Sequence, residues 1–393
     1  MIDTCDVVVV GGGPAGAATA IALARAGRDV VVLEQSLFDG ERIGETLPPE
    51  ARVPLAALEV WDRFVAQRHE PSPASISAWE HDAIDENHFV FNAYGHGWHL
   101  DRARFDSMLR SAAVDCGARL YRGARLTACV AGAAGTEAGY LHAGAVRTIR
   151  ARFIVDATGR ASIVARRQGA RRMRFDSLVA VVGMFSPSTA AAARDCRTLV
   201  EAACDGWWYS AWLPQSRLIA AYMTDGDLLQ ESADDVDAVW RRQLGKTVHT
   251  RLRLNDVVAR GPLRIVSACS DRLTPIAGHT WAAIGDAAMS VDPLSSQGIS
   301  WALKSGLIAA RAIEGHLDGD PAAIDELSTW TSGLFDRYWR THALHYSRVQ
   351  RWPESPFWRR RTPGNEVQTR VAAAGTFAQV AVSARAPDPR ARD

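Results

Sequence analysis

The stretch Asp6-Val-Val-Val-Val10-Gly11-Gly12-Gly13-Pro14-Ala15-Gly16 decides the fold. Its four consecutive valines are typical of a buried parallel strand, because such strands are short, continuous and rich in β-branched residues. The alanine-rich segment 17–26 then favours a helix, and 29–34 has the composition of a second buried strand. A strand, a Gly-x-Gly-x-x-Gly turn, a helix and a further strand form the βαβ unit that binds dinucleotides.

Each glycine of this turn has its own role in binding a dinucleotide. Gly11 permits the tight turn, Gly13 lets a diphosphate approach the backbone, and Gly16 lets the helix pack closely against the strand. We expect the diphosphate at the helix N-terminus, beside Pro14 and Ala15. Free N–H groups and the helix dipole favour negative charge there.

The acidic residue that ends the second strand completes the unit. Glu34 can accept hydrogen bonds from ribose hydroxyls, and we expect Gln35 to contact the same nucleoside. The carboxylate would repel a 2′-phosphate, so NADP is disfavoured here. A glycine-rich turn without a ligand is the alternative, and the complete unit argues against it. Motifs further along the chain decide between FAD and NAD.

The composition is that of a folded protein with room for two sub-domains. The chain has 393 residues, of which 47% are hydrophobic and 23% charged. Lys and Arg total 45 against 44 for Asp and Glu, so the basic excess of a nucleic-acid-binding protein is missing. The glycines and Pro14 interrupt the uncharged stretch 7–24, which argues against a membrane span or signal peptide. The six cysteines are scattered without a Cys-x-x-Cys pair, so we expect reduced thiols in a cytoplasmic protein and no metal site.

Two features far along the chain suit a flavin. Asp286 follows the short strand expected at 281–284 and can accept hydrogen bonds from a sugar-alcohol chain. A helix with apolar residues at helical spacing begins at Gly298. Its N-terminal amides could face the electron-rich edge of a reduced flavin.

The combined motifs resemble the flavoprotein monooxygenase superfamily that includes p-hydroxybenzoate hydroxylase, geranylgeranyl reductase and flavin-dependent halogenases. Gly285-Asp286 matches the segment that holds the flavin ribityl chain in that family. The segment Phe153-Ile-Val-Asp156-Ala-Thr-Gly159-Arg160 resembles its Asp-x-x-Gly motif near the FAD diphosphate. The resemblance therefore implies FAD, with Asp156, Gly159, Gly285 and Asp286 among the residues that bind it.

Further segments extend this resemblance. Arg102-Ala-Arg-Phe105-Asp106 is similar to the helix whose arginine contacts FAD. Gly44-Glu45-Thr46-Leu47-Pro48 is similar to the loop that lies along the flavin in the halogenase-like branch, which implies contacts from Gly44 and Glu45. Arg42 is a further candidate for flavin contact, with a solvated loop arginine as the alternative. The loop before Gly298 adds Pro293 and Gln297 to the expected cofactor-binding residues.

The resemblance implies an α/β fold in several parts. We expect a Rossmann-type FAD-binding domain, an inserted antiparallel β-sheet substrate domain and a C-terminal helical segment. Segments 178–185, 206–213 and 218–224 have the pattern of antiparallel strands. The expected boundaries are 1–70, 98–172 and 266–318 for the FAD-binding domain, 71–97 and 173–265 for the substrate domain, 319–383 for the C-terminal helices and 384–393 for a disordered tail.

One sub-branch of the superfamily is especially similar. Segments 292–298, 206–214 and 351–359 resemble halogenase-like flavoproteins that mature cysteine-tryptophylquinone, whose characterised members hydroxylate a tryptophan in a protein partner. Halogenases themselves carry a lysine on a strand after the Gly-Glu loop. The corresponding stretch, 75–82, contains none, and the chain's two lysines, Lys246 and Lys304, lie elsewhere in the sequence. The Trp-x-Trp-x-Ile-Pro motif of halogenases is altered as well, because Trp207, Trp208 and Trp212 are present but the spacing to Pro214 is longer. Hydroxylation is therefore favoured over halogenation.

The substrate side is less well defined by the sequence. Four aromatic residues on one expected strand, Trp207, Trp208, Tyr209 and Trp212, either form a wall for a planar substrate or belong to the core. His96 is a candidate general base, with a structural histidine as the alternative. Gln297 stands where halogenases carry a small hydroxyl residue beside the halide, and it is the second catalytic candidate.

The function implied is that of an FAD-dependent monooxygenase acting through a flavin C4a-hydroperoxide. The substrate would be a phenol or an indole, either free or carried on a peptide or carrier protein. Halogenation, a flavin reduction like that of geranylgeranyl reductase, and a non-enzymatic role in cofactor maturation are the alternatives. The sequence contains no second Gly-x-Gly-x-x-Gly domain. NAD(P)H would therefore bind transiently, or a separate flavin reductase would supply the electrons.

Overall fold

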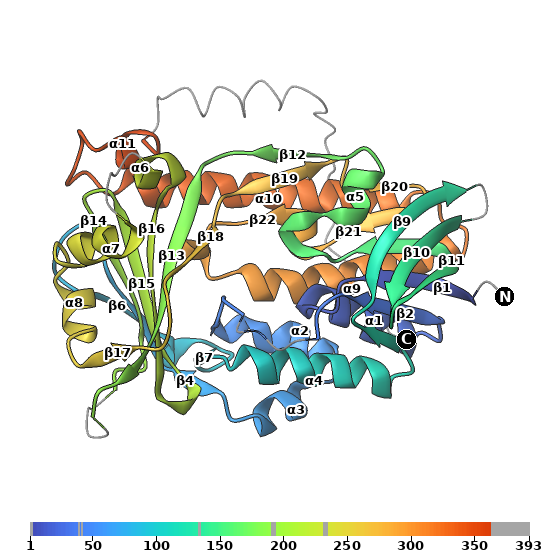
Figure 1. Cartoon of the computed structure of the whole chain (residues 1–393), viewed down its shortest axis with the longest axis horizontal. Helices are drawn as coiled ribbons and strands as arrows, with labels where there is room; N and C mark the ends of the chain where they lie inside the picture. The colour runs from blue at the N-terminus through green and yellow to red at the C-terminus, as the bar shows by residue number, and fades with distance from the viewer. Residues whose placement is uncertain are drawn as a thin grey trace, which may run out of the picture.

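The computed structural model has two parts side by side, joined by long helices (Figure 1). One part is built on a parallel sheet and the other on a mostly antiparallel sheet. This arrangement, with helices at the C-terminal side, confirms the predicted fold class. The structure describes residues 3–37, 40, 42–132, 135–189, 194–230 and 235–362. The predicted tail 384–393 and part of the predicted helical segment lie outside these residues.

The first part is centred on five parallel strands. Their order is β21-β11-β1-β2-β8, with β20 (Ala277–Gly278) antiparallel at one edge and the hairpin of β9 and β10 attached to β11. Both faces of the central strands are covered, which explains the unbroken valine runs. The bounds are β1 Asp3–Val10, β2 Val30–Glu34, β8 Arg119–Arg122, β9 Arg125–Gly132, β10 Gly135–His142, β11 Ala145–Asp156 and β21 Trp281–Ala283.

Alternate residues of β1 and β2 face different layers. Val7 and Val9 pack with α1 (Pro14–Arg25), α4 (Arg102–Asp115) and α9 (Gly298–Leu317), whereas Val8 and Val10 pack with α5 (Ile163–Arg167).

Helices α1 and α9 lie very close together. A Cβ at Gly306 of α9 would stand 2.7 Å from the carbonyl oxygen of Ala15, so only glycine fits there. This contact fixes the N-termini of both helices near the same edge of the sheet.

The second part is an eight-stranded sheet, called here the substrate sheet. Its order is β17-β13-β16-β15-β14-β5-β6, and β18 also pairs with β13. All pairs are antiparallel except β14 with β5. The three strands predicted between residues 178 and 224 are β13, β15 and β16. The bounds are β5 Ala74–Ala78, β6 Asp85–His88, β13 Leu178–Pro187, β14 Thr198–Ala203, β15 Gly206–Leu213, β16 Arg217–Asp225, β17 Val257–Ala259 and β18 Arg264–Ser267.

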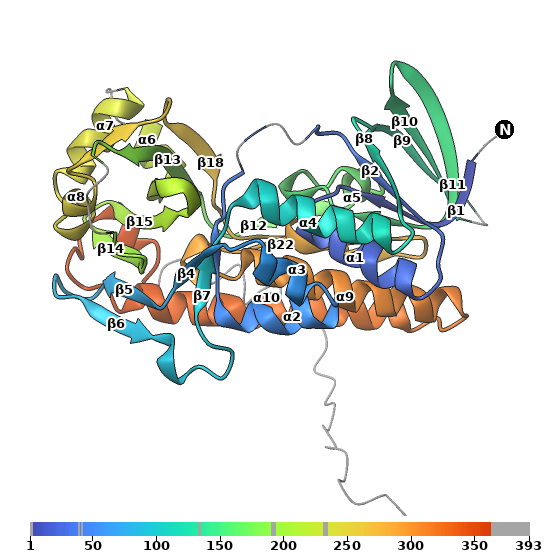
Figure 2. The same ribbon diagram turned by 90° about the horizontal axis from the view of Figure 1, so that it is seen from below.

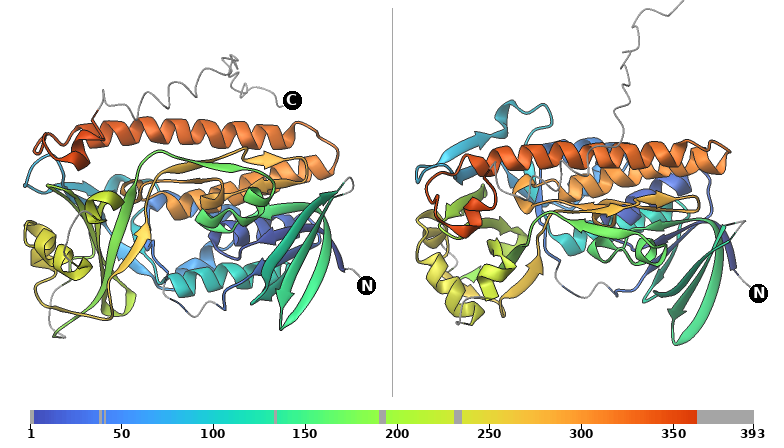
Figure 3. Two further views of the ribbon diagram at one scale, coloured as in Figure 1. Left: turned by 45° about the horizontal axis from the view of Figure 1, so that its top comes forward. Right: turned by 90° about the horizontal axis from the view of Figure 1, so that it is seen from above.

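Helices cover the substrate sheet from both sides. Helices α7 (Val236–Leu244) and α8 (His249–Arg253) lie on its outer side (Figure 2). Its inner side faces the first part and α10 (Ala323–Ser347), which runs along the length of the molecule (Figure 3). Short helix α11 (Pro356–Arg359) packs on the end of the sheet, where the buried Arg361 forms an ion pair with Asp225 at 2.5 Å.

Short elements complete the chain. Two three-stranded sheets, β3-β7-β4 and β12-β19-β22, connect the two parts. None of the helices within the described ranges has the length and apolar character needed to cross a membrane. The remaining bounds are α2 Arg52–Ala57, α3 Trp61–Ala66, α6 Gly226–Gln230, β3 Thr46–Leu47, β4 Glu70–Ser72, β7 Gly97–His99, β12 Arg171–Arg174, β19 Asp271–Thr274 and β22 Met289–Ser290.

Candidate active site

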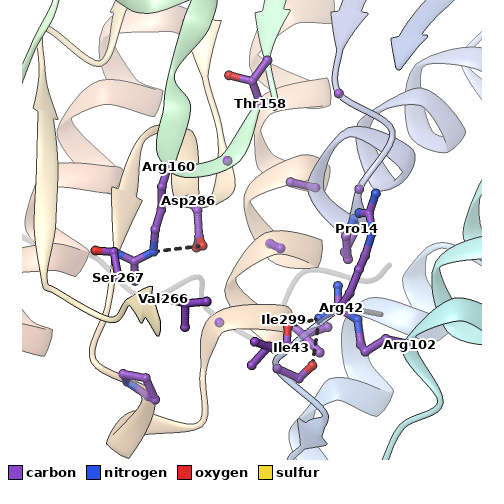
Figure 4. Close-up of a pocket in the computed structure, with 18 of the residues that line it drawn as sticks. Pro14, Arg42, Ile43, Arg102, Thr158, Arg160, Val266, Ser267, Asp286 and Ile299 are labelled. Atoms are coloured by element: carbon purple, nitrogen blue, oxygen red, sulfur yellow. Dashed lines mark hydrogen bonds and ion pairs between the residues drawn. The ribbon is translucent and has the colours of Figure 1, made fainter. Parts of the chain in front are cut away.

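A cavity of about 720 Å³ lies between the parallel sheet and the inner face of the substrate sheet. Its walls come from the ends of β1 and β2, the loop 42–46, the N-termini of α1 and α9, and strands β13 and β16. Figure 4 shows Arg160, Asp286 and Ser267 on one wall and Arg42 and Ile43 on the opposite wall. The cavity therefore joins the predicted dinucleotide site to the predicted substrate domain.

The glycine turn has the shape that a diphosphate requires. A Cβ at Gly11 would stand 2.2 Å from the carbonyl oxygen of Ala157, and one at Gly16 would stand 1.9 Å from the carbonyl oxygen of Gly11. A Cβ at Gly13 would meet only Arg42 Nη1, at 3.9 Å. Gly11 and Gly16 are thus required by the protein's own packing, whereas Gly13 faces open space at the N-terminus of α1. No side chain caps that N-terminus, so its amides are available to an anion.

Glu34 lies at the end of the cavity expected to hold the adenosine. It is buried, and its carboxylate oxygens accept hydrogen bonds from the N–H groups of Gly12 and Ser36, both at 2.7 Å. These bonds fix the carboxylate where a ribose hydroxyl could donate to it. Gln35 also lines this end.

Three of the predicted cofactor-binding residues lie behind the cavity wall. The Asp156 carboxylate accepts hydrogen bonds from the Thr158 N–H at 3.0 Å and the Ala165 N–H at 2.8 Å. It thereby fixes the turn that brings Gly159, with φ of 63°, to the cavity. A Cβ at Gly285 would meet the Cβ of Ala15 at 2.8 Å. Three predicted residues therefore support the wall of the cavity from behind and are not exposed in it. They are Gly16, Asp156 and Gly285.

Arg102 fixes the loop that precedes β3. Its Nη1 donates to the carbonyl oxygens of Ile43 and Gly44, both at 2.8 Å, and its guanidinium forms an ion pair with Asp106 at 3.2 Å. Arg42 reaches the same Asp106 at 3.4 Å. Gly44 has φ of 99°, a conformation that other residues rarely adopt. Two guanidinium groups are thus held on one wall, opposite Asp286.

The N-terminus of α9 forms the far end of the cavity. Pro293, Gln297 and Gly298 line it, and no side chain caps the helix. An electron-rich ring edge would be stabilised there by free amides and the helix dipole. Thr46 and Tyr209, whose hydroxyls are 2.7 Å apart, join this end to β15.

A buried hydrogen-bond network, which sequence reasoning missed, anchors this end of the cavity. The carboxylate of Asp292 accepts hydrogen bonds from the Tyr346 hydroxyl at 2.7 Å and from His342 at 3.2 Å. The N–H of Asp292 donates to the Tyr338 hydroxyl at 2.8 Å. Tyr338, His342 and Tyr346 are spaced four residues apart on α10, so they form one polar stripe. That spacing was the one signal visible in the sequence.

Glu45 is a buried acid within the predicted flavin loop. It lines the cavity and is 4% exposed. Burial raises the pKa of Glu45 to about 7, although the nearby Arg102 acts in the opposite direction. The carboxyl can therefore hold or release a proton near neutral pH.

This shift predicts a pH-dependent effect of Glu45→Gln on the FAD-free protein. Because the folded-state pKa is above the unfolded value of 4.5, the charged carboxylate costs stability progressively between about pH 4.5 and 7. At pH values above 7, the free energy of unfolding of Glu45→Gln should therefore exceed that of the wild type, by at most about 3 kcal/mol. At pH values below 4.5, the two proteins should be equally stable. Thermal unfolding on both sides of the window measures the effect. The exposed Glu326→Gln is the control, and an equal effect of Glu45→Gln at both pH values would contradict the assignment.

The four predicted substrate aromatics divide between the two faces of β15. Tyr209 lines the cavity, and Trp207 on the same face is buried with its Nε1 donating to Tyr346 at 2.8 Å. Trp208 points to the outer face, where it packs on Tyr222 and Trp240. Trp212 is buried and does not line the cavity, and the guanidinium of Arg194 lies over its ring. Of the four predicted wall residues Tyr209 alone lines the cavity, and Trp208 packs on the outer face of the sheet.

The structure does not bring His96 to the cavity. The residue is exposed, its Nδ1 lies 2.7 Å from the carbonyl oxygen of Gly97, and its ring packs against Trp98. The geometry therefore favours the structural alternative over a general base. Gln297, the other predicted catalytic residue, does line the cavity.

Both lysines of the chain lie in the described ranges and away from the cavity. Lys246 forms an ion pair with Asp205 at 3.4 Å, and Lys304 is on α9. Neither is among the cavity-lining residues.

Within the part of the chain that the structure describes, no group of three or more histidine, cysteine or acidic side chains is arranged to hold a metal ion.

Comparison with known proteins agrees with this geometry. The family described as "FAD binding domain" matches residues 4–328. The chain belongs to this FAD-binding family. The match spans the glycine turn, both walls of the cavity, the whole of α9 and the start of α10. The family, the free helix N-termini and the open space at Gly13 together identify FAD as the cofactor that fits the cavity.

Three known proteins are similar to this chain over most of its length. LodB of Marinomonas mediterranea, whose name classes it with FAD-dependent oxidoreductases, is 28% identical over 92% of this chain and 97% of its own length. The myxobacterial chondrochloren halogenase CndH is 26% identical with a TM-score of 0.85, over 95% of this chain and 90% of that chain. The peptidyl tryptophan dihydroxylase QhpG, essential for tryptophylquinone biogenesis, is 25% identical with a TM-score of 0.74, over 91% and 78%. The chain is thus a halogenase-like flavoprotein oxidoreductase.

Proposed function

We propose that the protein is an FAD-dependent monooxygenase that hydroxylates an aromatic ring. The observation that carries this proposal is the continuity of the cofactor cavity with the inner face of the substrate sheet. Ala180, Val182, Ile219, Ala221 and Met223 give that face an apolar surface, which suits a planar substrate and excludes water. When bound and reduced, FAD supplies the activated oxygen atom.

The chain's own residues would hold and orient this cofactor. The amides of α1 and the guanidinium groups of Arg42 and Arg102 would hold the diphosphate. Asp286 would accept hydrogen bonds from the ribityl chain, and the amides at Gly298 would face the electron-rich edge of the ring. Glu45, at the same end, is placed to hold or release a proton at its carboxyl oxygens.

A second pocket supports a substrate carried on a polypeptide. It has a volume of about 500 Å³ and shares Thr46 and Ser296 with the cofactor cavity. Phe89 and Phe91 line it, and Phe91 is 96% exposed, which leaves an apolar rim at its mouth. Such a rim could receive backbone and side chains flanking a tryptophan. QhpG acts on a peptidyl tryptophan, which is consistent with this choice of substrate class.

Halogenation is the second candidate, and the similarity to CndH favours it. The absence of both lysines from the cavity wall argues against it, because the resemblance to halogenases implies a lysine that handles the oxidised halide.

The electron donor is proposed to be transiently bound NAD(P)H, or a separate flavin reductase.

The test uses FAD-loaded protein that has been reduced by light without a nucleotide. It is mixed with dioxygen and a tryptophan-containing peptide, or with a simple phenol, in the presence and absence of bromide. The product should gain the mass of one oxygen atom regardless of bromide. A bromide-dependent product would establish the halogenase, and product formation without dioxygen would indicate a reductase or dehydrogenase.

A further inference from the structure

Strand β6 is an open edge of the substrate sheet. It pairs with β5 on one side, and within the described ranges no strand pairs with its other side. Figure 2 shows β6 at the margin of the molecule, and all four of its residues are exposed. An edge of this kind can accept a further strand from another chain.

The pairing with β5 determines which backbone groups of β6 are available. Phe89, directly after β6, donates its N–H to the carbonyl oxygen of Pro73 at 3.0 Å, and the same register continues along β6. Hydrogen-bonded pairs alternate along antiparallel strands, so the backbone groups of Asn87 face β5, whereas those of Glu86 and His88 face the open edge. An added strand could therefore pair with the N–H and C=O groups of both Glu86 and His88.

The end of β6 that carries His88 leads into the second pocket, which opens toward the flavin. His88, Phe89 and Phe91 line that pocket. Thr46 and Ser296 line it as well, and both also line the cofactor cavity. A side chain that leaves an added strand at this end would therefore enter a space that continues to the cofactor.

The surroundings of the pocket indicate which polypeptide segment would fit. Phe91 is 96% exposed and Val90 is 75% exposed, so apolar side chains of the segment would cover them. Glu50 also lines the pocket, and its Oε1 accepts a hydrogen bond from the neutral amide of Asn92 at 2.7 Å. A lysine or arginine beside the reacting aromatic residue would complement the charge of this carboxylate.

We propose that an extended segment of a protein substrate adds to β6 as a further strand and places its aromatic side chain in the second pocket. This inference rests on the proposed function in taking an aromatic side chain of a polypeptide as the group that is hydroxylated. Backbone hydrogen bonds to β6 would supply affinity for any sequence, whereas the pocket and Glu50 would select the aromatic and the basic residue. Free tryptophan lacks the backbone for these bonds and should bind far more weakly than a peptide.

The test selects peptides on the FAD-loaded protein. The probe is a phage-displayed library of short random peptides with a fixed central tryptophan. Enriched peptides are synthesised, and their dissociation constants are measured by fluorescence anisotropy. Each backbone N–H is then replaced in turn by an N-methyl group, which removes one donor and leaves the side chain unchanged.

The effect of N-methylation should repeat every second residue. Only alternate N–H groups of an added strand face β6, so methylation of those groups should weaken binding roughly tenfold or more, and methylation of the others should have little effect. The enriched sequences should carry a lysine or arginine near the tryptophan. Selection on Glu50→Gln should remove that preference.

Two aspartate variants locate the binding surface. Phe91→Asp alters the apolar turn that follows β6. Val146→Asp introduces the same charge at a valine of β11 that is 74% exposed, and it is the matched control. Phe91→Asp should raise the dissociation constant of the selected peptides roughly tenfold or more, and Val146→Asp should bind them as the wild type does. Thermal unfolding checks that both variants are folded.

Four results would overturn the proposal. The first three are a library that yields no binder, N-methylation effects that do not alternate, and equal peptide binding by the two variants. The fourth is a wild-type dimer that Phe91→Asp converts to a monomer, because it would assign the edge to a second copy of the chain.

Failure of this docking mode is distinguishable from failure of the proposed function. If light-reduced protein hydroxylates a selected peptide but the N-methylation effects do not alternate, only the docking mode is wrong. If the effects alternate but no selected peptide is hydroxylated, only the proposed function is wrong.

Discussion

Gly13→Val is expected to abolish FAD binding while the FAD-free protein stays folded. Gly13 has φ of −75° and ψ of −176°, an extended conformation that valine adopts readily. A Cβ there would meet no atom closer than Arg42 Nη1 at 3.9 Å, so the protein's own packing tolerates it. The added methyl groups would occupy the space that the diphosphate needs beside α1. The expected loss of affinity is on the order of a thousandfold, or about 4 kcal/mol.

The measurement is a fluorescence titration of the FAD-free variant with FAD, together with its thermal unfolding. Gly16→Val is the contrasting variant, because its Cβ would stand 1.9 Å from the carbonyl oxygen of Gly11. That substitution should prevent folding rather than only binding. Wild-type affinity of Gly13→Val for FAD would show that the diphosphate does not approach this glycine.

Asp292→Ala should destabilise the protein by about 3–5 kcal/mol, because it leaves buried hydrogen-bonding groups without their acceptor. Asp292 is 1% exposed and its carboxylate accepts from Tyr346, His342 and the N–H of Leu294. Burial alone would raise the pKa of Asp292, but the hydrogen bonds from His342 and Tyr346 hold it below its usual range. The stabilisation is therefore present at neutral pH and is lost only when acidification protonates the folded-state carboxylate.

Urea unfolding followed by tryptophan fluorescence measures this loss. Tyr346→Phe removes a single hydroxyl from the same network and should cost less, about 1–2 kcal/mol. Asp292→Ala should also weaken FAD binding, because Asp292 precedes the loop that leads to Gly298. A free energy of unfolding equal to that of the wild type would mean that the network does not anchor this loop.

The local features of the fold could be predicted from the sequence. The valine runs of β1 and β2, the glycine turn between them and the start of α9 at Gly298 all depend on neighbouring residues. The alternation of side chains along β15 also separated Trp207 and Tyr209 from Trp208 and Trp212. It could not indicate which face meets the cavity, since α7 packs against Trp208 on the outer face and residues of α10 and α11 pack against Trp207 on the inner one.

Contacts between distant segments could not be predicted. The network around Asp292 depends on α10 lying across both parts of the molecule, about fifty residues later in the chain. A pocket beside the flavin loop is likewise lined by residues of five separate segments, which lie within 40–45, 100–103, 182–184, 213–217 and 260–264. The prediction for His96 had the opposite problem. Flanking glycines and aromatic neighbours suggested a catalytic site, whereas His96 is exposed and does not line the cavity.

The most direct test of a monooxygenase uses dioxygen labelled with heavy oxygen. The FAD-loaded protein is reduced by light and then exposed to the labelled gas with a tryptophan-containing peptide. One heavy oxygen atom should appear in each new aromatic hydroxyl, and none should come from water. A hydroxyl whose oxygen comes from water, a halogenated ring, or a product formed without dioxygen would contradict the account.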